Sequence, residues 1–130
     1  MVNLLLYNIA SPEKLRKIQT LAIRLGFRTR VVRQEEFALP IGALVELPGA
    51  EALESGDGTP FLDEMLVLCG VSAQAFQAFL SGLRTQKTPV ALKAMTTEHN
   101  VSWSSSKLHG ELAAEHENMK KVQKTIHKEP

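Results

Sequence analysis

Two short apolar runs constrain the fold of this chain more than any other feature. They are residues 2–7 (VNLLLY) and residues 65–69 (MLVLC). Apolar residues at successive positions, rather than alternating ones, are typical of strands that are buried on both faces of a sheet. Such strands lie at the centre of a sheet that helices cover on both faces, so the sequence predicts an α/β domain.

Helix and strand signals alternate along the rest of the chain. Ser11 and Pro12 predict the start of an amphipathic helix that ends before Gly26. Residues 27–32 (FRTRVV) alternate apolar with polar residues before the last position, and their two arginines suit a strand at the edge of a sheet. The remaining predicted elements are a short helix after Pro40, an irregular loop over 48–60, a helix that Ser72 caps, a strand over 89–95 and a helix from about Ser104 to Met119.

The order of these elements predicts a small doubly wound domain with three layers. The two apolar strands belong in the centre and the arginine-bearing strand at an edge. This arrangement gives a four-stranded, mainly parallel sheet of order 2-1-3-4 with right-handed crossovers. A ferredoxin-like α+β sandwich is the alternative, but residues 32–64 would then form a hairpin link, and they are many for a hairpin.

Length, charge and hydropathy narrow the class of protein. A chain of 130 residues forms one core, and we expect a single globular domain over 1–119 and a basic, frayed tail over 120–130. Fifteen basic residues against 14 acidic ones argue against a nucleic-acid partner. No apolar run approaches the roughly 20 residues of a membrane span, and residues 1–8 lack the basic start of a signal peptide. We therefore expect a cytoplasmic protein with no membrane partner.

Polar side chains follow three of the predicted strands and form a candidate ligand-binding crevice. In open parallel sheets, ligands bind beyond the carboxyl ends of the strands, where the strand order reverses. Here that point lies between the first and third strands. The residues expected there are Tyr7, Asn8, Cys69, Gly70, Ser72, Thr96, Thr97 and His99, with Ser11 beside them.

No motif in the chain carries a complete catalytic or cofactor-binding signature. Residues 70–74 (GVSAQ) lack the second glycine of the serine-hydrolase elbow, and Ser72 fits a helix N-cap better. No glycine-rich phosphate loop is present. His109 and His116 are seven positions apart, whereas helical metal sites use spacings of three or four. We therefore assign no catalytic residue, metal or cofactor.

Cys69 and Lys93 each have two interpretations. Cys69 precedes a predicted helix start, which would lower its thiol pKa, but a lone cysteine is also a common buried residue. Lys93 interrupts an apolar strand. It is either a buried functional lysine or, as the sequence favours, a side chain that extends from an edge strand with its stem packed.

Three stretches of the chain together resemble a known family. They are residues 5–8 (LLYN), residues 64–70 (EMLVLCG), and residues 90–97 (VALKAMTT) continuing through Trp103 to His116. The chain is similar here to the bacterial domain-of-unknown-function family numbered 3783. The resemblance covers most of residues 3–119 and implies a bacterial, cytoplasmic domain. It implies no activity, cofactor or catalytic residue.

The sequence leaves three functional hypotheses. The leading one is a non-enzymatic binding or interaction domain whose small-molecule or protein ligand lies at the predicted crevice. The alternative is a thiol-dependent enzyme or redox-sensitive switch that uses Cys69. The third is a homodimer whose seam includes Trp103 and the face of the last helix that carries the histidines.

Overall fold

The computed structural model describes the backbone of residues 1–128 and the side chains of residues 1–119. The elements in chain order are β1 (Leu4–Tyr7), α1 (Pro12–Arg24), β2 (Thr29–Val32), the 3₁₀ turn η1 (Gln34–Glu36), α2 (Ile41–Leu44), the 3₁₀ turn η2 (Ala50–Ala52), β3 (Met65–Leu68), α3 (Ala73–Thr85), β4 (Leu92–Met95) and α4 (Ser105–Lys128). Among the described helices, none combines the length and the hydropathy that a bilayer span requires.

The four strands form one sheet of order β2-β1-β3-β4, which confirms the predicted order. β1 runs parallel to β2, and β3 runs parallel to β4. The central pair, β1 and β3, is antiparallel, with Leu4 opposite Leu68 and Tyr7 opposite Met65. The sheet is therefore mainly parallel, as expected, but mixed at its centre. In a ferredoxin-like fold another strand separates the two parallel strands of each unit, whereas here they pair directly.

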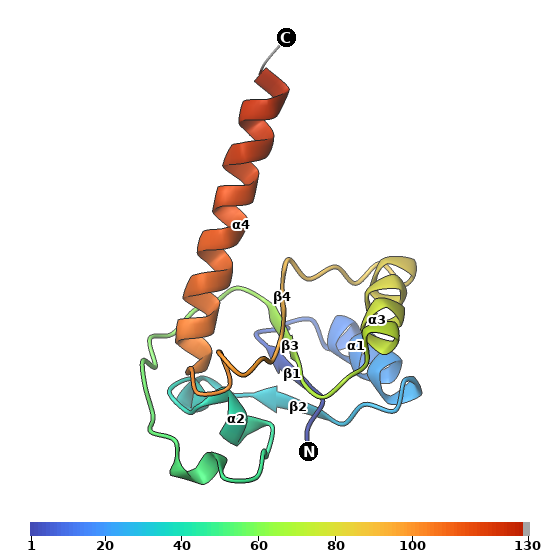
Figure 1. The fold of residues 1–130 in the computed structure, drawn as a ribbon. Helices are drawn as coiled ribbons and strands as arrows, with labels where there is room; N and C mark the ends of the chain where they lie inside the picture. The colour runs from blue at the N-terminus through green and yellow to red at the C-terminus, as the bar shows by residue number, and fades with distance from the viewer. Residues whose placement is uncertain (129–130) are drawn as a thin grey trace.

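The antiparallel centre explains why α1 and α3 lie on the same face of the sheet (Figure 1). The chain contains two successive strand-helix-strand units, and such crossovers are nearly always right-handed. The first unit steps outward from β1 to β2, and the second steps outward from β3 to β4 in the opposite direction. When the two units also run in opposite directions, right-handed crossovers place both helices on one face.

Two hydrophobic clusters cover the two faces of the sheet. Leu4, Leu6, Leu66 and Leu68 point toward α1 and α3, where Phe79 is fully buried. The alternate residues of β1 and β3, which include Tyr7 and Met65, pack on the opposite face against the segment that contains η1 and α2 and against the start of α4. Both central strands are buried at every position, as the two apolar runs predicted.

The helices begin where the sequence predicts. The Ser11 hydroxyl accepts the backbone N–H of Lys14, and the Ser72 hydroxyl accepts that of Ala75. Gly26, with φ of 82°, follows α1 in the left-handed conformation that glycine adopts readily. Each helix therefore takes its boundaries from local signals in the sequence.

The helix α4 closes the second face of the sheet with its first turns and then leaves the body of the domain (Figure 1). The Ser104 hydroxyl accepts the backbone N–H of Lys107, so the expected helix start at Ser104 is observed. Leu108 is buried, and Leu112 and Trp103 pack against the same cluster. α4 continues to Lys128, beyond the predicted end of the helix near Met119, and the expected fraying of residues 120–130 stays a prediction.

Candidate functional site

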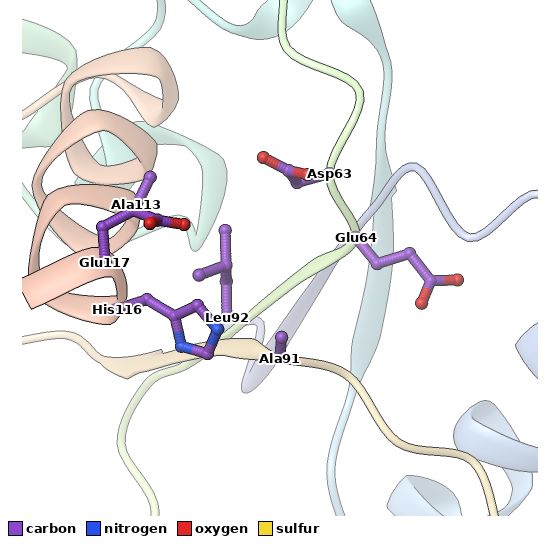
Figure 2. A pocket seen from close by; sticks show the side chains of 7 residues that line it. All are labelled: Asp63, Glu64, Ala91, Leu92, Ala113, His116 and Glu117. Carbon is purple, nitrogen blue, oxygen red and sulfur yellow. The ribbon is translucent and has the colours of Figure 1, made fainter. Parts of the chain in front are cut away.

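A cavity of about 380 Å³ lies between the sheet and α4 (Figure 2). Its walls come from the segment before β3, the start of β4, and the third and fourth turns of α4. The lining residues are Asp63, Glu64, Ala91, Leu92, Ala113, His116 and Glu117. This volume is within the usual range of small-ligand sites, about 300–1,000 Å³.

The side chain of Asp63 is held in place by His109, which is 46 positions away in the chain. Its carboxylate oxygen Oδ2 lies 2.9 Å from Nε2 of His109 on α4. The His109 ring in turn stacks on Phe61, with ring centroids 4.0 Å apart. Because Phe61 belongs to the buried aromatic cluster with Tyr7 and Phe37, the imidazole is fixed and orients the carboxylate.

Asn8 fixes the backbone of the same segment. Its side-chain amide donates to the carbonyl oxygens of Phe61 and Asp63, at 2.9 and 3.0 Å. Asn8 has a φ of 60°, a left-handed conformation that asparagine tolerates better than most residues. Asn8, one of the predicted site residues, therefore holds the backbone of the segment that contributes Asp63 to the cavity wall.

The electrostatic character of the cavity is acidic. Three of its seven lining residues carry carboxylates, one is a histidine, and none is lysine or arginine. Figure 2 shows Asp63 directed toward the α4 side of the cavity and Glu64 directed away from it. Glu64 forms an ion pair of 2.6 Å with Lys14 of α1. The carboxylates of Asp63 and Glu117 supply the negative charge on the α4 side.

No group of histidine, cysteine and carboxylate side chains within the described residues could hold a metal ion. His109 and His116 lie one above the other on α4, yet His109 is engaged with Asp63 and Phe61.

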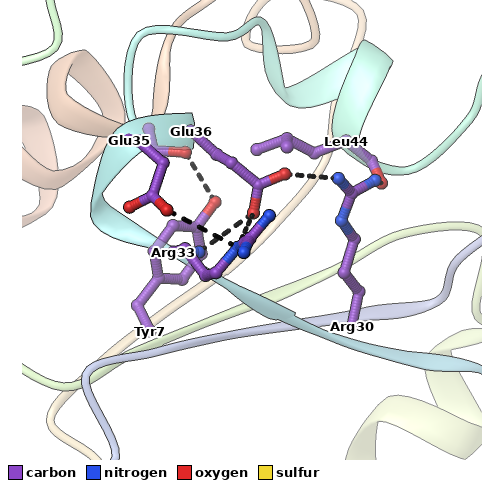
Figure 3. A network of polar contacts seen from close by, with 7 residues as sticks. Tyr7, Arg30, Arg33, Glu35, Glu36 and Leu44 are labelled. Atoms are coloured by element: carbon purple, nitrogen blue, oxygen red, sulfur yellow. Dashed lines mark hydrogen bonds and ion pairs between the residues drawn. The ribbon is translucent and has the colours of Figure 1, made fainter.

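A buried polar network behind the cavity attaches α4 and α2 to the sheet (Figure 3). The hydroxyl groups of Tyr7 and Ser105 lie 2.7 Å apart, and burial raises the pKa of the Tyr7 phenol, so the phenol stays protonated. Arg30 on β2 donates to the carbonyl oxygen of Leu44 and to the carboxylate of Glu36. The contact between Tyr7 and Ser105 attaches the first turn of α4 to β1, and the contacts of Arg30 attach η1 and α2 to β2.

The predicted crevice residues do not form a single crevice. Because β1 and β3 are antiparallel, their carboxyl ends point in opposite directions and lie at the two opposite ends of the strands. Tyr7, Asn8 and Ser11 are at one end. The others follow β3 and β4 at the opposite end: Cys69, Gly70, Ser72, Thr96, Thr97 and His99. The expectation that strands one and three jointly present a crevice is corrected by this pairing, and a ligand-binding role for either group stays a prediction.

Most residues of the second group serve the local backbone. Gly70 has a φ of 67°, and Ser72 caps α3. Asn100 accepts the backbone N–H of Thr97, and its own backbone N–H donates to the Thr97 hydroxyl. His99 is exposed, and the Thr96 hydroxyl is buried without a partner among the described residues. These contacts explain the residue types at this end of the strands as caps and turns.

Cys69 is buried, with 5% of its surface exposed, at the end of β3. Since a thiolate must be reachable to act as a nucleophile, we expect a thiol reagent to leave native Cys69 unlabelled at pH 7.5 and to label it completely in denaturant. Mass spectrometry after a timed exposure to iodoacetamide measures both states. Rapid labelling of the folded protein would restore the hypothesis of thiol chemistry.

Sequence reasoning missed the carboxylate cavity because its residues are far apart in the chain. Asp63 and His109 are 46 positions apart, and neither belongs to a recognisable motif. The only signal was the seven-residue spacing of His109 and His116, which places both on one face of a helix. That spacing indicated that the two histidines share one face of a helix. It did not indicate which other segments of the chain this face would contact.

Among the comparisons with known proteins, one family model matches a part of the chain. Searches of curated proteins and of solved structures gave no match. A family model described as a domain of unknown function matches the segment that includes β3, α3, β4 and the first part of α4. Six of the seven residues that line the cavity are inside this segment, and Asp63 is directly before it. Residues 64–119 of the chain therefore match the domain of unknown function family DUF3783, as the resemblance in the sequence predicted.

Proposed function

We propose that this chain is a non-enzymatic binding domain of the bacterial cytoplasm, and that the cavity beside α4 receives a cationic group of its ligand or partner. The observation that carries the proposal is the cavity itself. It measures about 380 Å³, and its lining contains three carboxylates and no basic side chain apart from a histidine. An ammonium or a guanidinium group complements this lining in charge and in hydrogen bonding, since such groups have donors and no acceptors.

The arrangement of the carboxylates supports binding more than chemistry. Asp63 is oriented before any ligand arrives, because His109 and the Asn8 amide hold its side chain and its backbone. Preorganised groups bind at a lower entropic cost. Leu92 and Ala113 supply apolar contact for the carbon chain that bears the cation. The lining offers no hydroxyl, thiol or amine that could act as a nucleophile.

A titration with small cations tests the proposal. Butylamine and butylguanidine are the probes, and butanol is the neutral match. We expect both cations to shift the amide resonances of Leu92, Ala113 and His116, with dissociation constants on the order of millimolar. The double substitution Asp63→Asn with Glu117→Gln keeps the size of both side chains and removes the two carboxylates that supply the negative charge on the α4 side of the cavity. It should weaken cation binding by about fivefold or more, because charge-assisted hydrogen bonds are roughly twice as strong as neutral ones.

The control variant is Glu54→Gln, since Glu54 is exposed in the loop between η2 and β3, outside the lining of the cavity. It should bind the cations as the parent protein does. Equal binding of butanol and butylamine, or unchanged binding by the double variant, would show that the carboxylates do not recognise a cation. Native mass spectrometry of the freshly purified protein then identifies any retained ligand.

A further inference from the structure

A second hollow, on the opposite face of the sheet, has the reverse chemistry. It measures about 240 Å³ and lies between the end of α3 and the approach to β4. Its lining residues are Leu80, Leu83, Arg84, Pro89, Val90 and Lys93. Leu83 and Val90 belong to the hydrophobic cluster under α1 and α3, whereas Leu92 in the acidic cavity belongs to the other cluster. The two cavities therefore lie on different sides of β4.

The two basic residues of this hollow, Arg84 and Lys93, form no ion pair with a carboxylate in the part of the chain whose side chains are described, residues 1–119. The Lys93 ammonium instead donates to the carbonyl oxygen of Val90. The stem of Lys93 is partly buried on the edge strand, and this burial lowers the pKa of the ammonium. A partly desolvated ammonium whose hydrogen-bond acceptor is a neutral carbonyl is stabilised when an anion approaches it.

Apolar surface occupies the remainder of the hollow. Leu80, Leu83, Pro89 and Val90 contribute no charged group. A fully hydrated inorganic anion would gain nothing from these side chains, whereas a short hydrocarbon chain would bury its surface against them. At about 240 Å³ the hollow is smaller than sites for drug-sized molecules, which begin near about 300 Å³. The chemistry therefore selects a small molecule with one anionic end and one short apolar chain.

We propose that the hollow between α3 and β4 is a binding site for a small aliphatic carboxylic acid, with Lys93 and Arg84 at the carboxylate and with Leu80, Leu83, Pro89 and Val90 around the chain. Arg84 can bind a carboxylate through two parallel N–H donors, and Lys93 adds a point charge. The proposal is independent of the cation site, because it uses different residues on the other face of the sheet.

Hexanoate is the probe that tests this site, with hexanol and hexylamine as the neutral and cationic matches. We expect hexanoate to shift the amide resonances of Leu83, Val90 and Lys93, and to bind at least about fivefold more tightly than hexanol. Hexylamine should not bind here. If hexanoate shifts none of these resonances up to about 10 mM, or if hexanol binds as well as hexanoate, the proposal is wrong.

Two substitutions separate the charges from the apolar surface. Lys93→Met keeps the length of the stem, and Arg84→Gln changes an exposed residue near the end of α3. Each should weaken hexanoate binding by about fivefold or more, while circular dichroism confirms an unchanged fold. Arg16→Gln, at an exposed arginine of α1 outside the lining of the hollow, is the matched control and should bind as the parent does. If Arg84→Gln and Lys93→Met both leave hexanoate binding unchanged, the assignment of the carboxylate to these cations fails.

Discussion

Replacing Phe37 with alanine is expected to lower the free energy of unfolding by about 3–5 kcal/mol. Phe37 is 1% exposed and lies between two other rings. It stacks on Phe61 at a centroid distance of 4.4 Å and contacts Tyr7 at 5.8 Å. The substitution removes buried apolar surface and leaves a cavity that the flanking rings fill only partly, and both effects destabilise the folded state.

The same ring also supports the candidate site. Phe37 stacks on Phe61, and Phe61 also stacks on the imidazole of His109. That imidazole orients the carboxylate of Asp63. Guanidinium denaturation followed by circular dichroism measures the loss of stability. Leu62→Ala is the control, because Leu62 is 93% exposed and should change stability by no more than about 0.5 kcal/mol. A loss below about 1 kcal/mol for Phe37→Ala would mean that the aromatic cluster is not packed as described.

Replacing Glu36 with glutamine is expected to lower the free energy of unfolding at pH 7 by about 2 kcal/mol. The Glu36 side chain is 15% exposed and binds the guanidinium of Arg30. Its second carboxylate oxygen accepts the backbone N–H of Arg33 at 3.0 Å. Glutamine keeps one acceptor but loses the charge, which leaves Arg30 in the network behind α4 without its counter-ion.

The effect of Glu36 should depend on pH in a defined direction. Burial alone would raise the pKa of this carboxyl, but the hydrogen bonds from Arg33 and Arg30 and their positive charges outweigh burial and lower it. A pKa that is lower in the folded state than in the unfolded state stabilises the protein above the unfolded value, about 4.3 for glutamate. This stabilisation is lost as pH falls through the folded pKa, when the folded carboxylate takes up its proton.

Urea denaturation of the parent protein and of Glu36→Gln between pH 3 and pH 7 measures this dependence. The difference in stability should be largest at pH 7 and should shrink below about pH 4.3. Glu35→Gln is the matched control, since Glu35 is adjacent, is 70% exposed and has only a weak contact with Arg33 at 3.8 Å. A difference that stays constant across the pH range would show that Glu36 does not act through its charge.

Much of the fold was predictable because its signals are local. Ser11 and Ser72 bind backbone N–H groups three residues ahead, so a helix start is encoded within a few positions. The uninterrupted burial of β1 and β3 follows from their runs of apolar residues. The arginines at positions 28 and 30 indicated an edge strand, and β2 is at an edge. Together these signals were enough to predict the strand order.

The candidate site could not be predicted in the same way. Asn8, Asp63 and His109 come from three distant segments, and each residue type is common in turns or on helix surfaces. The alternation of strands and helices also suggested that the carboxyl ends of the first and third strands would meet. That expectation placed Tyr7 and Cys69 together, whereas the structure places them at opposite ends of the strands.

Local sequence signals were sufficient for the main helices and strands and for the choice of the central strands, and residues 64–119 match a known domain family. The direction of β3 relative to β1 emerges only in the folded protein, and it separates the carboxyl ends of these two strands. It could not be predicted because the pattern of apolar residues in a doubly buried strand is the same in either direction. The direction of β3 is set instead by residues 33–64, which connect the end of β2 to the start of β3. The contacts of Glu36 with Arg30 and of Phe61 with Tyr7 hold this connecting segment against the sheet.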